Sequence, residues 1–391
     1  MTFRFFIIFL ISFAFLFQAG KFYTFYLEYS PWQYGDWLIN YQGGFIRRGL
    51  IGELFYSIYK LTNIKLDLII FTSVILFYLL FSLILIKSSR YFVKSKLDYL
   101  LFLSPGFFLY PVMNSEIIGR KDIILVLMVG IFVFFKDIFR KNLNYIIAIL
   151  SIIFLTLSHS GFLFYSQYLI AIYFFSQIKI NKKVENWKFA VYVVLILGLG
   201  ILVNLFPGNE TQVIKICNSV SSFSQDNCTN SGQIGWLINN MSNYLYEKIE
   251  FGLFTLINQF IIYLISFCFI FIFLFKKIEN SKFIISFKNI KNLKPIKLFI
   301  ILILISLPIF ILGRDWGRYI YLSYSCSIFL YIFLLKNNLI VLNRLNTPKF
   351  FKKKIIFLFF VFIYSFFWSV PFYDAKFFKF TLVKPIVNLI N

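Results

Sequence analysis

The sequence predicts an all-α, polytopic membrane protein, and its composition points to this class. The chain has 391 residues, of which 60% are hydrophobic, and its mean hydropathy is +0.80. Soluble domains have about 45–50% apolar and roughly 25% charged residues, whereas only 14% of these residues are charged. The apolar residues also form long uninterrupted runs. These runs exclude a disordered chain, a fibrous repeat, a small disulfide scaffold and a barrel of alternating strands.

Each membrane-crossing helix needs roughly 20 mainly apolar residues to cross a hydrocarbon core about 30 Å thick. This criterion predicts about eleven spans. They lie at Phe5–Ala19, Leu68–Ile86, Leu97–Val112, Ile123–Phe135, Tyr145–Leu157, Phe162–Ile178, Phe189–Phe206, Phe251–Phe275, Leu298–Leu312, Tyr319–Leu335 and Ile355–Val370. The first run also has features of a signal peptide, but no clear cleavage site follows Ala19, so we expect a retained anchor.

The basic residues predict the orientation, because Lys and Arg collect in short cytoplasmic loops. With the N-terminus inside, most of the 39 Lys and Arg residues fall in inside segments. We therefore expect a bacterial inner (cytoplasmic) membrane protein with a cytoplasmic N-terminus and an extracytoplasmic C-terminus. The net charge of +23 then indicates contact with membrane lipids, and no nucleic-acid partner is expected.

Two outer segments of this single transmembrane domain, 1–391, are too long to be simple connectors. The first outer loop covers residues 20–67, and its stretch Phe45–Leu61 has the spacing of an amphipathic helix lying in the membrane interface. The long outer loop covers residues 207–250, before the eighth span. Its Cys217 and Cys228 are a candidate disulfide on an oxidising face.

Mixed-charge clusters with Gly, Trp and Asn lie on the predicted outer face, which holds almost every unusual residue of the chain. They are YGDWLINYQGGFIRRGLIGE at 34–53, MNSEIIGRKD at 113–122 and GRDWGRY at 313–319. Arginines with neighbouring carboxylates suit anionic oxygens such as those of a diphosphate. The candidate diphosphate-binding residues are Arg47, Arg48, Arg120, Lys121, Arg314 and Arg318.

Local spacing suggests how these charges are arranged. Arg47 and Arg48 are expected in the first turn of the amphipathic helix, where they oppose the helix dipole unless an anion binds there. Glu116 and Arg120 are i,i+4 neighbours and can pair if their turn is helical. The alternative for each cluster is that its charges anchor the ends of spans or bind lipid headgroups.

The third cluster predicts Arg314 and Arg318 one turn apart on one helix face, with Asp315 orienting one of them. His159, the only histidine, lies at the outer end of the fifth span. It is either a base or proton relay, or a helix-end residue bonded to a carbonyl. No metal-ligand constellation accompanies it, and no nucleotide-binding motif is present, so neither a metal site nor a cofactor is predicted.

With Asp36 soon after the first span, a long outer loop and extracytoplasmic arginines, the chain resembles bacterial O-antigen and capsular polysaccharide polymerases and related C-type-fold membrane glycosyltransferases. The resemblance implies sugar transfer from a polyprenyl-diphosphate carrier outside the membrane, with other polysaccharide-assembly membrane proteins as partners. It implies the catalytic candidates Asp36, Glu116, Asp315 and His159 and the sugar-stacking candidates Trp37 and Trp316.

Three other classes compete with this interpretation. A flippase for lipid-linked sugars would be expected to bury charges at mid-membrane and to use both faces, whereas the ionisable residues here lie at span ends. A membrane acyltransferase would need a His or Ser beside an acyl donor, and His159 is the one available histidine. A structural assembly protein does not explain why the clusters lie on one face.

Overall fold

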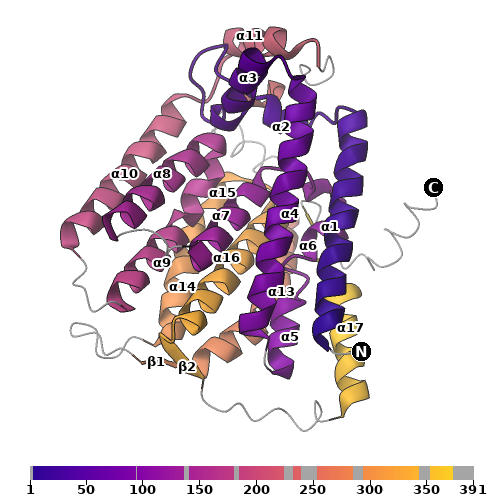
Figure 1. Cartoon of the computed structure of the whole chain (residues 1–391), viewed down its shortest axis with the longest axis vertical. Coiled ribbons are helices and arrows are strands. Elements are labelled where there is room, and N and C mark those ends of the chain that lie inside the picture. The colour runs from indigo at the N-terminus through magenta and orange to yellow at the C-terminus, as the bar shows by residue number, and fades with distance from the viewer. Residues whose placement is uncertain are drawn as a thin grey trace. The chain divides into compact units, whose positions relative to one another are not determined.

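The computed structural model describes residues 3–93, 95–135, 141–179, 185–223, 232–238, 253–284, 294–342 and 353–372. Within these ranges the chain is almost entirely helical, and the only strands are two segments of three residues (Figure 1). The protein is therefore an all-α, multi-pass membrane protein, as its composition predicts.

Six helices of the described chain are long and apolar enough to cross a membrane: Phe5–Leu27, Leu66–Phe92, Asn186–Leu205, Ile257–Glu279, Pro295–Leu312 and Trp316–Lys336. Three shorter apolar helices cover Asp122–Phe134, Leu143–Ser158 and Ile355–Phe366. The predicted number of about eleven spans stays a prediction.

One predicted span, Leu97–Val112, is not a continuous helix. Helix α5 (Lys96–Phe102) ends before the Pro105-Gly106 pair, and α6 (Tyr110–Met113) is a single turn beyond it. Proline and glycine end a helix because proline lacks an N–H group and glycine favours turns. The segment between them is buried throughout, which is where irregular backbone is tolerated in a membrane protein.

The chain divides into two compact units. Unit 1 comprises Met1–Ala14, Leu83–Glu116 and Ile249–Asn391, and unit 2 comprises Phe15–Ser82 and Ile117–Lys248. The division falls within α1 (Phe3–Leu27) and α4 (Leu66–Phe92), so each of these helices contributes residues to both units.

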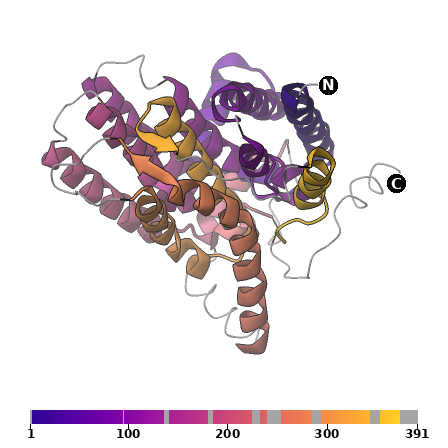
Figure 2. The same ribbon diagram turned by 90° about the horizontal axis from the view of Figure 1, so that it is seen from below.

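Unit 1 is built around α16 (Trp316–Lys336), whose apolar stretch is 89% buried. Around it pack α13 (Leu253–Glu279) and the helices α14 (Pro295–Ser306) and α15 (Pro308–Leu312), which are separated at Pro308. The strands β1 (Ser281–Phe283) and β2 (Ile340–Leu342) pair antiparallel, as the two arrows in Figure 2 show. Helix α17 (Lys354–Phe366) packs on α5.

A buried ion pair joins two helix ends within unit 1. Lys277, in the last turn of α13, lies 2.7 Å from Asp98 Oδ1, and both side chains are 3% exposed. Asp98 also accepts hydrogen bonds from the backbone N–H and the hydroxyl of Ser95, at 2.6 and 2.7 Å. The pair therefore fixes the start of α5 to the end of α13.

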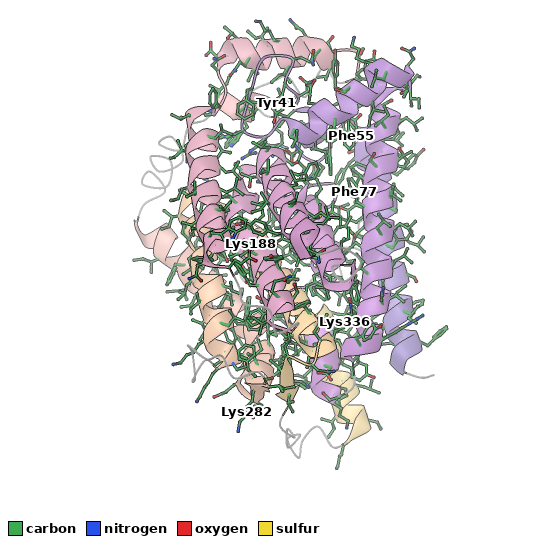
Figure 3. The ribbon with its side chains drawn as sticks, turned by 60° about the vertical axis from the view of Figure 1, so that its left-hand side comes forward. Tyr41, Phe55, Phe77, Lys188, Lys282 and Lys336 are labelled. Carbon is green, nitrogen blue, oxygen red and sulfur yellow. The ribbon has the colours of Figure 1, made fainter. Side chains whose placement is uncertain are left out.

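Unit 2 contains a group of apolar helices and two folded outer loops. The apolar helices are α7 (Asp122–Phe135), α8 (Lys141–Ser158), α9 (Ser166–Lys179), which follows the 3-10 turn η3 (Ser160–Tyr165), and α10 (Asn186–Leu205). The first outer loop contains α2 (Gly35–Leu38) and α3 (Leu50–Thr62), and the long outer loop contains α11 (Glu210–Val220) and the 3-10 turn η5 (Gly235–Ile238). In Figure 3, Tyr41 and Phe55 lie near one end of unit 2, and Lys188, at the start of α10, lies well away from them.

The amphipathic helix of the first outer loop begins later than predicted. It starts at Leu50 rather than Phe45, so Arg47 and Arg48 lie in the turn before α3 and not in its first turn. Glu53, in the first turn of α3, accepts from the backbone N–H of Tyr41 at 2.8 Å and so holds the preceding loop against the start of the helix.

The two faces of α3 differ in their surroundings. Ile51, Gly52, Phe55 and Tyr56 are buried within unit 2. Leu54, Ile58 and Leu61 form an apolar stripe that is 46%, 42% and 84% exposed. An exposed apolar stripe at helical spacing suits a helix that lies in the membrane interface.

Gly52 sets how closely α3 approaches the segment carrying α2. A Cβ atom there would lie 1.9 Å from the carbonyl oxygen of Ile39. We expect Gly52→Ala to destabilise the purified protein by about 1–3 kcal/mol, because overpacking forces the backbone to shift. Thermal unfolding in detergent measures this effect.

The matched control is Gly198→Ala in α10, where a Cβ would meet nothing within 4 Å. Alanine is favoured over glycine in a helix by roughly 0.5–1 kcal/mol, so this variant should melt at or above the wild-type temperature. Equal melting temperatures for the two variants would show that α3 does not depend on close approach.

Candidate functional site

The short helix α2 places two predicted site residues inside unit 2. Asp36 is 3% exposed and Trp37 is completely buried. The Trp37 indole N–H donates to the carbonyl of Gly119 at 2.5 Å, and its ring lies 6.0 and 6.1 Å from the rings of Phe55 and Phe77. Because the Trp37 ring has no exposed face, its role is packing rather than the sugar stacking predicted for it.

Lys121 is the centre of this region. Its ammonium lies 3.4 Å from Asp36 Oδ1 and donates to the backbone carbonyls of Arg48 and Ser158, both at 3.2 Å. The side chain of Lys121 is 0% exposed. Two of its three N–H donors are used by the backbone carbonyls, and its charge is paired with the Asp36 carboxylate. The predicted role of Lys121 in binding a diphosphate therefore does not fit, and Lys121 instead joins three segments of the chain.

Electrostatics in this group follow from burial. Removal from water lowers the pKa of Lys121, while the Asp36 carboxylate opposes this shift and the Arg48 guanidinium adds to it. The Asp36 carboxylate is the anionic partner of this buried ammonium.

A tight turn positions Lys121 at the start of α7. Gly119 has φ +81, and a Cβ there would lie 2.6 Å from the ring of Phe22. Its N–H donates to the hydroxyl of Tyr78 at 2.7 Å. Glycine is required by both the left-handed backbone and the close approach.

The same turn changes the expectation for the second cluster. Glu116 lies in the 3-10 turn η1 (Ser115–Ile117), and no α-helix connects it to Arg120. The pairing of Glu116 with Arg120 stays a prediction. Glu116 falls in unit 1, whereas Arg120, which is 9% exposed, falls in unit 2 beside Lys121.

The two arginines of the first outer loop are held by different segments. The backbone N–H of Arg47 donates to the carbonyl of Phe206, at the end of α10, at 3.1 Å. Arg48 Nη1 donates to Oε1 of Gln233 at 3.2 Å. Within the described residues Arg48 has no carboxylate partner, and its buried Nε has no hydrogen-bond acceptor. Arg48 is therefore a cation whose charge no described carboxylate balances.

The long outer loop folds onto the first outer loop. Gln212 Nε2 donates to the carbonyl of Phe45 at 3.4 Å, and Asn40 Nδ2 donates to the Ser219 hydroxyl at 2.9 Å. Figure 1 shows α11 and α3 together at one end of unit 2. The sequence did not indicate these contacts, since an isolated Gln or Asn in a polar loop carries no motif.

Cys217 of α11 is disulfide-bonded. Cys228, its predicted partner, lies outside the described residues. Cys268 and Cys326 are free thiols. Among the residues described, no group of three or more His, Cys, Asp or Glu side chains is arranged to hold a metal ion.

His159 lies next to the Lys121 group, because Ser158 supplies one of the Lys121 acceptors. Its Nδ1 accepts from the backbone N–H of Gly161 at 3.2 Å, and its ring stacks on Phe162 at 4.8 Å. A neutral imidazole that accepts at Nδ1 carries its proton on Nε2. This tautomer donates at Nε2, which favours a hydrogen-bonding role over the predicted role as a base.

The third cluster belongs to unit 1. Arg318 is 4% exposed and pairs with Asp315 at 3.2 Å. Helix α16 begins at Trp316, so Arg314 precedes it, and the predicted one-turn spacing of Arg314 and Arg318 on a helix face is not formed. The Trp316 indole N–H donates to the carbonyl of Phe310 at 2.7 Å, while the ring stays partly exposed.

Comparison with protein-family models, with curated proteins and with solved structures found no match. The class that the fold defines is that of a multi-pass membrane protein. Any more specific function is inferred from the chemistry of the groups described above.

The Asp36–Lys121 pair allows a test by double substitution. Lys121→Met leaves the Asp36 carboxylate buried without its cation, and breaking a buried pair in this way costs about 3–5 kcal/mol. Asp36→Asn combined with Lys121→Met removes both charges, so the double variant should melt at a higher temperature than Lys121→Met alone. Additive losses of thermal stability would show that the two side chains do not interact.

Proposed function

We propose that the protein is an integral membrane glycosyltransferase that uses a polyprenyl-diphosphate-linked sugar at the extracytoplasmic face to build a surface glycan, O-antigen or capsule. The observation that carries the proposal is that unit 2 holds a buried carboxylate and, close to it, an arginine whose charge is not balanced by a described carboxylate. Asp36 is buried beside a cation, and Arg48, whose carbonyl contacts the same Lys121, has no balancing carboxylate among the described residues.

In the proposed reaction, the hydroxyl oxygen of an acceptor sugar forms a bond to the anomeric carbon of the donor. The bond between that carbon and the diphosphate oxygen breaks, and the polyprenyl diphosphate leaves with the electron pair. Asp36 takes the hydroxyl proton as general base. Arg48 stabilises the negative charge that develops on the leaving diphosphate.

Other predicted residues keep narrower roles in the proposal. Arg47 and Arg120 add positive charge to the same unit and favour an anionic ligand. His159 serves as a hydrogen-bond donor through Nε2 rather than as a base. Arg314 and Arg318 are separate candidates in unit 1, each tested alone by alanine substitution.

The positions of the charged pairs favour an enzyme over a flippase. Where the structure describes ion pairs between helices or within a turn, they lie at helix ends: Lys277 ends α13, and Lys188, paired with Glu185 at 3.0 Å, begins α10. A flippase would be expected to keep ionisable groups along its mid-membrane path.

The activity prediction compares Asp36→Asn and Arg48→Ala with Lys60→Ala, a substitution on the exposed face of α3. Removing one donor to a developing oxyanion lowers kcat by roughly 10²–10³-fold, and we expect a loss of this size for Arg48→Ala. We expect Asp36→Asn to abolish transfer and Lys60→Ala to leave it unchanged. The measurement is transfer of labelled sugar from polyprenyl diphosphate in purified membranes, at matched protein levels.

Full activity in both Asp36→Asn and Arg48→Ala would remove the proposed site. A loss in all three variants, Lys60→Ala included, would mean that the assay reports damage to the fold.

The orientation has its own test. The proposed topology puts Leu61, which is 84% exposed, outside the cell membrane and Glu185 inside. A membrane-impermeant maleimide should label Leu61→Cys in intact cells and Glu185→Cys only after permeabilisation. The unsubstituted protein gives the background labelling from its native thiols. The opposite labelling pattern would invert the topology and remove the extracytoplasmic site.

A further inference from the structure

The segment around η5 is anchored to the first outer loop beside Arg48. The backbone N–H of Gln233 donates to the carbonyl of Pro31 at 3.1 Å. Trp236 packs edge-on against Trp32, with 5.6 Å between ring centroids. Gln233 is 6% exposed. These contacts hold a residue of the long outer loop against residues that precede α2, about 200 positions earlier in the chain.

Gln233 accepts a hydrogen bond from Arg48 through an uncharged amide oxygen. Its Oε1 accepts from Arg48 Nη1 at 3.2 Å. A carboxylate at this position would orient the guanidinium equally well, but it would also cancel the positive charge. An amide fixes the direction of the guanidinium and leaves the charge intact for an anion.

The remaining donors of Arg48 point to the kind of ligand. Nη1 is engaged by Gln233, whereas the buried Nε has no acceptor among the described residues. The Nε–H and the neighbouring Nη2–H bonds are parallel and match two oxygens of one phosphate group. A buried donor without an acceptor is costly, so a ligand oxygen at this edge would stabilise the arrangement.

We infer that Gln233 is a positioning residue, which directs the Nε–Nη2 edge of Arg48 toward a phosphate group of a polyprenyl diphosphate. This inference rests on the proposed function and deepens it, because it makes the long outer loop part of the donor site. Lys121 holds the backbone of Arg48, and Gln233 holds its guanidinium.

The test measures binding of farnesyl diphosphate to the full-length protein in nanodiscs by calorimetry, with farnesol as the uncharged control. We expect the wild-type protein to bind the diphosphate and not the alcohol. Gln233→Glu, nearly the same size, should weaken binding about tenfold because its carboxylate neutralises Arg48. Gln233→Met, which lacks the acceptor, should weaken binding several-fold.

The matched control is Gln212→Met, a glutamine of the same loop that bonds to the Phe45 carbonyl. It should bind the diphosphate as the wild type does. In the Arg48→Ala background, Gln233→Met should cause no additional loss of affinity, because a positioning residue acts only through Arg48. A residue with a merely structural role would weaken binding in both backgrounds.

The outcomes separate the inference from the proposed function. Loss of binding in Arg48→Ala with unchanged binding in Gln233→Glu overturns the inference and leaves the proposed function standing. The expected binding pattern without any sugar transfer supports the inference and overturns the glycosyltransferase. A wild-type protein that does not bind farnesyl diphosphate overturns both.

Discussion

Most of the architecture of unit 2 depends on how one buried ammonium is satisfied. Lys121 has no exposed surface, and it contacts Asp36, the carbonyl of Arg48 and the carbonyl of Ser158. A buried charge is tolerated only when it is paired and hydrogen-bonded. The first outer loop, the start of α7 and the end of α8 must therefore meet at one point. This constraint gives the outer loop a defined structure where a long connector would otherwise be mobile.

The arrangement also divides the charges between two tasks. Lys121 and Asp36 satisfy each other inside the protein. Arg48 is held through its backbone by Lys121 and through its guanidinium by a neutral amide. The charge of Lys121 is thus balanced by a carboxylate within the protein, whereas no described carboxylate balances the charge of Arg48. A site for an anion needs this separation, because a cation already paired with a carboxylate has little attraction left for a ligand.

Several features of the site could not be predicted from sequence because they depend on contacts between distant segments. Phe45–Leu61 has helical spacing, yet the helix begins only at Leu50, where Glu53 of its first turn bonds back to Tyr41. Leu97–Val112 is mainly apolar, but its buried surroundings allow the Pro105-Gly106 break. The spacing of the charged residues also assigned Lys121 to ligand binding. The backbone carbonyls that accept its hydrogen bonds cannot be recognised in the sequence.

The sequence by itself determined that this is a helical, multi-pass membrane protein with charged clusters between its apolar runs. Hydrophobicity and helix length are properties of contiguous residues, so the sequence alone shows which segments can cross a bilayer as helices. Only the tertiary structure decided that Trp37 is buried, that Lys121 is buried and paired with Asp36, and that Gln233 bonds to Arg48. The partners of a buried polar group are chosen by packing, and packing joins residues that no local pattern connects.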